Sequence, residues 1–369
     1  KTAYEIYQCD WSSDVCSSDL STTYRGNNFH DMPYAGALSS STTNYINTYY
    51  TFFGWYLYGT ASLPVVFDGN TTRLIDAYTQ FFHSYLYYTY CTNFINNVVD
   101  KNESYLNTTN YLHWFYYSYD NNIAGNRITN NLFSNIGTGG TTYIFYNFYN
   151  YNSVRTVNLF EENRIDSNRC SGSIYTAYLY YCGSLRVARN SITHNSGGST
   201  VGFFYGFLFY YGDNLWVNSN LIAKNYGYTA NYNFYSYGFS SGFTCDIRQN
   251  TLHTRPSNYI YHFCYGYLFQ ETNSNLSFVG NILDADANYY IYPVYLLANN
   301  AANVKEINHN SYLMTGSGTQ VWRSGTSNYS NYNSWKGDIL VGAQDNYTNP
   351  QWVDFAKLDM RSNAFETQN

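Results

Sequence analysis

The densest group of charged residues lies in two short segments of a chain that otherwise carries little charge, with Asp, Glu, Lys and Arg making up only 11% of it. The group comprises Glu161, Glu162, Arg164, Asp166, Arg186, Arg189 and His194. Carboxylates beside arginines could bind a metal ion or a uronate and could move a proton. The favoured alternative is a ladder of surface ion pairs, each contributing about 0–1 kcal/mol. Asp284 and Asp286 form a second candidate group and could chelate calcium, although a solvated loop is the favoured explanation.

A repeat must position these residues. Asparagine recurs with steps of 29, 37, 27, 30, 30, 31 and 29 residues. An apolar residue stands three positions before each of these asparagines, and a further apolar or aromatic residue two positions after it. The repeated positions are Asn97, Asn126, Asn163, Asn190, Asn220, Asn250, Asn281 and Asn310. In the first five copies a second asparagine follows five residues later. A fixed period of this length predicts a β-solenoid.

The asparagine marks a turn in each coil. Apolar residues alternate with exposed ones before it, as in Leu185-Arg-Val187, which predicts a short strand. The alternation breaks at the asparagine, so the chain must turn there, and we expect the asparagine itself to tolerate the left-handed geometry. Because stacked coils lie about 4.8 Å apart, each amide could bond to the turns above and below. Each bond would contribute about 0.5–1.5 kcal/mol.

The repeat predicts which candidate residues are neighbours. One position before the asparagine, Glu162 should lie beside Arg189, and one position after it Arg127 should lie beside Arg164. Four positions before it, Arg186 and Trp216 point outward on adjacent coils. An exposed Trp over Arg suggests a cation–π contact or part of a sugar-stacking platform.

The remainder of each period is aromatic. Aromatic residues make up 21% of the chain, and 47 of them are tyrosines. Runs such as 203–211 are strand-forming, so two or three strands per coil are expected. Tyr205, Tyr235 and Tyr295 each stand fifteen residues before their asparagine, which predicts an aromatic column. A column facing water would offer flat surfaces to a glycan, whereas an inward column, the favoured interpretation, would be core.

Several other classes are disfavoured. A leucine-rich repeat needs a Leu eight residues before the asparagine, and none of the eight copies has one. The uncharged segment 50–67 contains two glycines and a proline, so we predict aromatic strands rather than a membrane span. No basic stripe indicates nucleic-acid binding. The five cysteines after residue 20 lack the spacing of a zinc site, and Cys245 is predicted to be a buried thiol.

The first twenty residues are set apart from the fold. Segments 1–6 and 10–20 back-translate to a common sequencing-library adapter, so we treat 1–20 as an artefact that is not native. The predicted domains are then a β-helix over 21–340 and a C-terminal closing segment over 341–369.

The pattern LxVxxNxIxxN with a period near 30 resembles the right-handed parallel β-helix, or pectate-lyase-like, superfamily. The resemblance covers about residues 90–315, with weaker copies at Asn70 and Asn27. It implies an all-β fold, a single-stranded right-handed parallel β-helix of about ten coils of roughly 30 residues. It also implies either a polysaccharide-active enzyme or a non-catalytic surface protein. The short catalytic signatures of the polygalacturonase-type enzymes are absent.

The expected function is therefore a secreted or cell-surface structural or adhesive module without a cofactor. It would bind polysaccharide or a cell-surface glycan through Trp216, Tyr205, Tyr235 and Tyr295. The alternative is a polysaccharide lyase or glycoside hydrolase acting on acidic glycans with the charged group around Glu161 and Arg189, assisted by calcium if it is a lyase.

Overall fold

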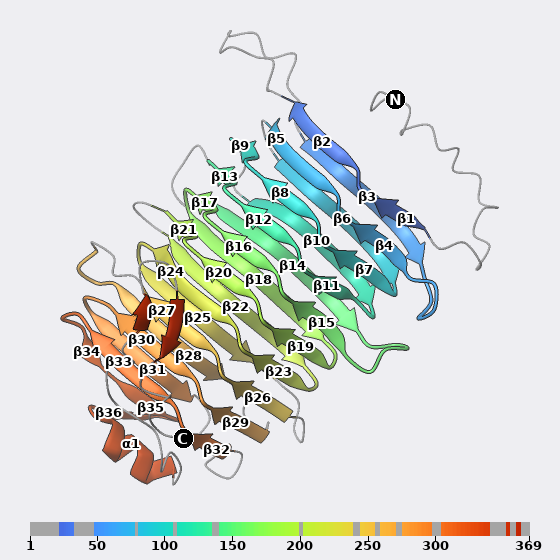
Figure 1. The fold of residues 1–369 in the computed structure, drawn as a ribbon. Coiled ribbons are helices and arrows are strands. Elements are labelled where there is room, and N and C mark those ends of the chain that lie inside the picture. The colour runs from blue at the N-terminus through green and yellow to red at the C-terminus, as the bar shows by residue number, and fades with distance from the viewer. Residues whose placement is uncertain are drawn as a thin grey trace.

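The chain forms a parallel β-solenoid, in which strands of successive coils lie side by side from one end of the molecule to the other (Figure 1). The computed structural model describes residues 22–32, 48–77, 80–105, 109–134, 140–198, 202–238, 244–254, 259–270, 275–296, 304–339, 352–354 and 359–362. The predicted adapter segment 1–20 and most of the predicted closing segment 341–369 lie outside these ranges. Each coil contributes strands to three parallel sheets, which confirms the all-β solenoid. A coil has three strands, or four where its sheet B segment is divided, against the two or three expected.

Sheet A holds the short strand that precedes each ladder asparagine. Its ten strands pair in parallel, each with the equivalent strand of the next coil. In spatial order they are β1 (Thr23–Arg25), β4 (Val65–Asp68), β7 (Thr92–Ile95), β11 (Asn122–Ala124), β15 (Asn158–Glu161), β19 (Leu185–Ala188), β23 (Leu215–Asn218), β26 (Thr244–Arg248), β29 (Asn275–Val279) and β32 (Val304–Asn308).

Sheet B follows the asparagine turn and has 14 strands. In some coils a second turn divides the sheet B segment into two short strands. The main strands are β2 (Asn28–Met32), β5 (Thr71–Ala77), β8 (Val98–Asp100), β12 (Arg127–Thr129), β16 (Arg164–Asp166), β20 (Ser191–Thr193), β24 (Leu221–Gly227), β27 (Thr251–Thr254), β30 (Ile282–Asp286) and β33 (Ser311–Thr315). The strands after the second turn are β9 (Glu103–Ser104), β13 (Leu132–Phe133), β17 (Arg169–Cys170) and β21 (Ser196–Gly197).

Sheet C contains the longest strands, and these are the aromatic segments of the sequence. Its parallel strands are β3 (Thr48–Tyr58), β6 (Gln80–Tyr90), β10 (Thr109–Tyr119), β14 (Thr141–Tyr151), β18 (Ser173–Cys182), β22 (Phe203–Gly212), β25 (Ala230–Tyr237), β28 (Phe263–Gln270), β31 (Tyr290–Leu296), β34 (Thr319–Gln320) and β35 (Trp322–Ser324). Strands β3 and β4 occupy the uncharged segment 50–67, so the prediction of strands there is confirmed. No helix in the described ranges combines the length and apolarity needed to cross a bilayer.

The C-terminal end of the solenoid is covered by a short helix. Strand β36 (Ser327–Tyr329) pairs with β35 in antiparallel fashion, and α1 (Tyr332–Ile339) follows it (Figure 1). The buried Trp335 of α1 lies 5.1 Å, between ring centroids, from the buried Trp322 of β35. This contact seals the last aromatic residues of the core against water. Two more strands, β37 (Trp352–Asp354) and β38 (Asp359–Ser362), form a separate antiparallel pair.

The asparagine ladder is confirmed. It runs without interruption through the eight predicted residues and the two weaker copies, Asn27 and Asn70. In a representative rung, Asn190 Nδ2 donates to Asn220 Oδ1 at 2.9 Å and to the carbonyl oxygen of Phe160 at 2.9 Å. Asn190 Oδ1 accepts the backbone N–H of Asn163 at 2.9 Å. Each buried amide thus satisfies backbone groups that the turn would otherwise leave without partners.

The prediction that the ladder asparagine itself adopts left-handed backbone geometry is wrong, because that geometry occurs one residue earlier. The left-handed conformation belongs to the residue before it, with φ between 55° and 66° in all ten turns. These residues are Gly26, Gly69, Asn96, Gly125, Glu162, Arg189, Ser219, Gln249, Gly280 and His309. The asparagine is free to point inward because its neighbour takes the left-handed position. A second ladder runs through Asn102, Asn131, Asn168, Asn195 and Asn225, as the sequence predicts.

One coil is longer than the others because of an insertion that folds over a buried carboxylate. Asp120 is fully buried, and its carboxylate accepts the backbone N–H groups of Ser153, Val154 and Arg155 at 2.8–2.9 Å. The insertion between β14 and β15 supplies five of the eight residues by which the step of 37 exceeds the preceding step of 29, because the register offset rises from 32 at Tyr151 to 37 at Leu159. A carboxylate that accepts three backbone N–H groups fixes a loop that would otherwise lack hydrogen-bond partners.

Candidate functional site

The outer face of sheet C is the most unusual surface of the molecule. Nine strands of sheet C, from β3 along the sheet to β31, contain no Asp, Glu, Lys or Arg. Their outward side chains are mostly aromatic, and their inward side chains, such as Leu112, Ile144 and Phe204, are buried in the core. We call this outer aromatic surface the tyrosine wall.

The rings of the tyrosine wall form five columns along the solenoid, because the parallel register places each ring next to the equivalent ring of the next coil. Column I is Tyr50, Phe82, Tyr111, Tyr143, Tyr175, Tyr205, Tyr232, Tyr265 and Tyr292. Column II is Phe53, Tyr85, Trp114, Tyr146 and Tyr178. Column III is Trp55, Tyr87, Tyr116, Phe148, Tyr180, Tyr210 and Tyr237. Column IV is Tyr56, Tyr88, Tyr117, Tyr149, Tyr181 and Tyr211. Column V is Tyr58, Tyr90, Tyr119 and Tyr151.

Column IV exists because of a repeated backbone distortion. Its six tyrosines all have left-handed backbone geometry, with φ between 48° and 57°. This geometry lets two consecutive residues point outward, for example Phe148 and Tyr149, whose rings meet edge to face at 4.4 Å. A bulky side chain is unfavourable in the left-handed region, where Gly or Asn would fit without strain. Tyrosine stands in all six places, so the position retains an outward phenol ring at a cost in backbone energy.

The tyrosine wall presents ring edges and hydroxyl groups rather than ring faces. Most neighbouring rings within a column are nearly parallel, as in Tyr175 and Tyr205, with centroids 4.2 Å apart and planes at 4°. In such a stack each ring covers a face of the ring in the next coil. Burial, and then the neighbouring Tyr181, raise the pKa of Tyr180 to about 12. This phenol therefore stays protonated at neutral pH, and the nine strands add no Asp, Glu, Lys or Arg to the hydroxyl groups of the wall.

The structure does not place Tyr205, Tyr235 and Tyr295 in one column. Tyr205 belongs to column I, whereas Tyr235 pairs in register with Leu208 and Leu268 and Tyr295 pairs with Leu268. The predicted column requires a constant distance from the ladder asparagine. That distance varies because the connections between sheets C and A differ in length from coil to coil. The expectation of inward core stacking is also wrong, because the columns lie on the outer face.

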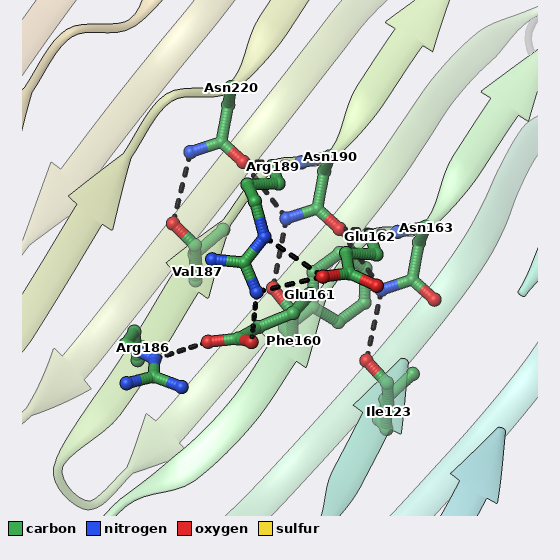
Figure 2. Close-up of polar contacts among 10 residues, drawn as sticks. All are labelled: Ile123, Phe160, Glu161, Glu162, Asn163, Arg186, Val187, Arg189, Asn190 and Asn220. Carbon is green, nitrogen blue, oxygen red and sulfur yellow. Dashed lines mark hydrogen bonds and ion pairs between the residues drawn. The ribbon is translucent and has the colours of Figure 1, made fainter. Parts of the chain in front are cut away.

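The charged group beside the ladder is a network of ion pairs (Figure 2). The Arg189 guanidinium lies between two carboxylates: Nη2 is 2.9 Å from Glu161 Oε2, and Nε donates to Glu162 Oε1 at 2.9 Å. The Nε of Arg186 bonds to the other oxygen of Glu161. The predicted neighbours Glu162 and Arg189 are therefore confirmed, and they occupy the left-handed turn positions beside the ladder.

A second ion-pair cluster lies on sheet B, on the other side of the turn. Asp166 accepts hydrogen bonds from Thr193 at 2.7 Å and from Arg164 at 3.1 Å, and His194 Nδ1 is 3.0 Å away. Burial acts to raise the pKa of Asp166, but the hydrogen bonds from Thr193, His194 and Arg164 outweigh it and lower the pKa. Arg127 lies beside Arg164 in register, as predicted.

These charged residues are engaged with one another rather than arranged around a free reactive group. The hydrogen bond to Glu162, and then the charge of Glu161, raise the pKa of Arg189, so this guanidinium stays a cation. An arginine base would need the opposite shift. The carboxylates of Glu161 and Asp166 already accept bonds from cationic or polar partners. The geometry is that of an ion-pair ladder between coils.

Asp284 and Asp286 lie in strand β30, so the expectation of a solvated loop is wrong. Asp284 is 3.1 Å from His253 Nδ1 and nearly buried. Burial, and then the charge of Asp284, raise the pKa of Asp286. Within the described ranges, no group of three or more His, Cys, Asp or Glu side chains could hold a metal ion.

Trp216 and Arg186 are neighbours in register on sheet A, as predicted, but they do not lie on the tyrosine wall. In the described ranges, the cation–ring contacts are Arg323 over Tyr295 at 4.6 Å and Lys336 over Tyr332 at 5.9 Å. The guanidinium of Arg186 instead bonds to Glu161. The sequence interpretation thus paired the correct strands, its cation–π alternative is wrong, and its sugar-stacking alternative stays a prediction.

Sequence reasoning missed the tyrosine wall, although a signal for it is present. Adjacent outward aromatics recur as Tyr87-Tyr88, Tyr116-Tyr117, Phe148-Tyr149, Tyr180-Tyr181 and Tyr210-Tyr211, with steps of 29, 32, 32 and 30 residues. Alignment on these pairs would have given the register of sheet C directly. Comparison of the chain with family models, with curated proteins and with solved structures finds no match in any of the three.

Proposed function

We propose that this protein is a non-catalytic structural or adhesive module of a secreted or cell-surface protein, and that it binds polysaccharide through the tyrosine wall. The observation that carries the proposal is the set of five ring columns on nine strands of sheet C, β3 to β31, that contain no charged residue. A large exposed aromatic surface on a stable scaffold is typical of an interaction site. The pectate-lyase-like relationship and the right-handed coil belong to the same proposal, supported by the asparagine ladder between sheets A and B.

The strained tyrosines of column IV support a role in binding rather than in folding. Their side chains are outside the core, and Gly or Asn would relieve the strain of the left-handed backbone. Stacking within the column explains an aromatic ring at these six positions, but it does not explain the hydroxyl group that all six carry. A binding surface does, because tyrosine supplies a rigid, amphipathic contact at low entropic cost.

Binding would run through the phenol hydroxyls and ring edges. Where the rings of a column are stacked, they cover one another's faces, so these rings offer a sugar mainly their edges and hydroxyl groups. The wall repeats its hydroxyls at the spacing of the coils, about 4.8 Å. Such an array suits a long chain with many hydroxyl groups, because many weak hydrogen bonds act together. The absence of charge on these nine strands favours a neutral glycan over an acidic one.

The alternative function is a lyase or hydrolase that acts on acidic glycans with Glu161, Glu162 and Arg189. Figure 2 shows these side chains bonded to one another, and the raised pKa of Arg189 makes it a poor base. A lyase would in addition use calcium.

The test incubates the protein with insoluble neutral glycans and with pectin, alginate and glycosaminoglycans, with and without calcium. Co-sedimentation measures binding, while ultraviolet absorbance and new reducing ends measure cleavage. We expect binding to neutral glycans without turnover. Turnover that is lost in Glu162→Gln or Arg189→Gln would establish the enzymatic alternative instead.

A matched pair of variants locates the binding surface. Tyr117→Phe, Tyr149→Phe and Tyr181→Phe together remove three hydroxyls from column IV but keep its rings. The rings should still stack, since Phe82 and Phe148 occupy column positions naturally. The control removes three hydroxyls outside the columns through Tyr24→Phe, Tyr226→Phe and Tyr329→Phe. Binding should weaken in the first variant and not in the control. Equal binding by both variants would contradict a role for the wall hydroxyls.

A further inference from the structure

The tyrosine wall holds phenol groups of neighbouring coils unusually close together. Tyr90 and Tyr119, in column V, have ring centroids 4.4 Å apart and planes at 2°. In column IV, Tyr149 lies 4.8 Å from Tyr117 and 5.1 Å from Tyr181. The members of each pair are 29–32 residues apart in sequence, so each pair connects two coils. All five tyrosines are at least partly exposed to solvent.

The wall also holds a dense set of oxidisable phenol rings. The five cysteines of the described ranges are all buried, which removes the thiols from contact with an oxidant in solution. Column IV carries a phenol in each of its six positions. A radical formed on one ring of this column therefore has at least one neighbouring phenol ring at about van der Waals distance.

We propose that the tyrosine wall is a site of oxidative phenol coupling, at which a haem peroxidase with hydrogen peroxide joins tyrosines of neighbouring coils through carbon–carbon bonds. This coupling uses the same surface as the proposed function but does not depend on glycan binding. Its product would be a covalent staple between coils, placed on the outside of sheet C.

The chemistry balances with peroxide as the oxidant. Each of two phenols loses one electron and one proton from its O–H bond and becomes a tyrosyl radical. The two radicals couple at their ortho carbons, and the ortho hydrogens then move to the oxygens, which restores both phenols. One hydrogen peroxide takes up the two electrons and two protons and leaves as two water molecules. The cross-linked protein has lost two hydrogen atoms, and the two side chains must both turn and lean toward each other for the ortho carbons to meet.

The chain contains its own negative control. In column III, Phe148 separates Tyr116 from Tyr180, with centroids 5.1 and 4.3 Å from the two rings. Phenylalanine stacks equally well but has no phenol hydrogen to lose. Coupling between Tyr116 and Tyr180 should therefore be absent in the folded protein, even though both belong to a column.

The experiment treats the dilute folded protein with peroxidase and hydrogen peroxide and then measures dityrosine fluorescence. Cross-linked peptides are mapped by mass spectrometry in the monomer fraction, and the urea-unfolded chain is treated in parallel. We expect in-register links of Tyr90 to Tyr119 and of Tyr149 to Tyr117 or Tyr181, each with the loss of two hydrogen atoms. In the unfolded chain this pattern should give way to links without register.

Two variants sharpen the test. Tyr119→Phe should abolish the link to Tyr90 and leave the column IV links intact, whereas Tyr329→Phe, outside the columns, should change nothing. The Tyr116–Tyr180 comparison needs no variant and stands even if a substitution impairs folding. Dityrosine only in oligomers, the same link pattern in folded and unfolded chains, or no dityrosine in the folded monomer would each overturn the proposal. Loss of glycan binding with coupling intact would refute only the proposed function.

Discussion

Replacing one ladder asparagine tests whether the amides hold the coils together. Asn220 is buried, and its side chain makes four hydrogen bonds. Its Oδ1 accepts the N–H and Nδ2 groups of Asn190, both at 2.9 Å. Its Nδ2 donates to the carbonyl oxygen of Val187 at 3.0 Å and to Asn250 Oδ1 at 2.9 Å. At about 1 kcal/mol net per bond, Asn220→Ala should lower the free energy of unfolding by roughly 4 kcal/mol.

The matched control lies two residues away in the same coil. Asn218 is part-buried on strand β23, and its Oδ1 has no hydrogen-bond partner within the described residues. Asn218→Ala should therefore cost no more than about 1 kcal/mol, the scale of a substitution that breaks no specific contact. Denaturant unfolding, followed by circular dichroism, measures both variants against the wild type. A cost for Asn220→Ala no greater than that for Asn218→Ala would refute the stabilising role that we assign to the ladder.

Three further predictions address the core, the insertion and the ion pairs. Asp120→Asn should destabilise the protein by about 1–3 kcal/mol and speed trypsin cleavage after Arg155, because the insertion depends on that carboxylate; unchanged cleavage would contradict this role. Burial, and then a neighbouring histidine, lower the pKa of His113 well below 6.5. The unfolded chain thus binds more protons below that pH, and stability should fall by about 1.4 kcal/mol per pH unit for this residue as the pH drops below 6.5. His113→Phe, which places there the residue found in the next coil, should reduce the slope of unfolding free energy against pH, and an unchanged slope would refute the assignment. Glu161→Gln should cost about 1 kcal/mol at low salt and less at high salt, and the more exposed Glu162→Gln should cost less than Glu161→Gln; salt-independent costs would contradict an ion-pair ladder.

The ladder could be predicted from the sequence because its chemistry leaves a strict signature. A buried amide that bonds to the coils on both sides must recur once per coil, in line with an apolar residue three positions earlier. Asn163, Asn190 and Asn220 therefore mark the repeat, and the pairing of Glu162 with Arg189 follows from it. The residue with left-handed geometry was harder to place, since Gly, Asn, Ser, Gln, Glu, Arg and His all occupy that position in different coils.

The tyrosine wall could not be predicted from the ladder alone. Its register is fixed within sheet C, while the connection to sheet A varies in length, so a count from Asn220 or Asn250 misplaces Tyr205 and Tyr235. The direction of the aromatic side chains was also hidden. Strict alternation cannot place Phe148 and Tyr149 on the same face, and only the left-handed backbone of Tyr149 allows it.

The central claim is that the hydroxyl groups of the tyrosine wall contact a polysaccharide. The most direct measurement is the fraction of protein that sediments with an insoluble neutral glycan, compared between the wild type and the variant in which Tyr117, Tyr149 and Tyr181 are all phenylalanine. The fold and the ring columns should be the same in both proteins, so the hydroxyls are the difference. We predict clear retention of the wild type and reduced retention of the variant. Equal retention of the two proteins, or no retention of the wild type on any glycan, would contradict the claim.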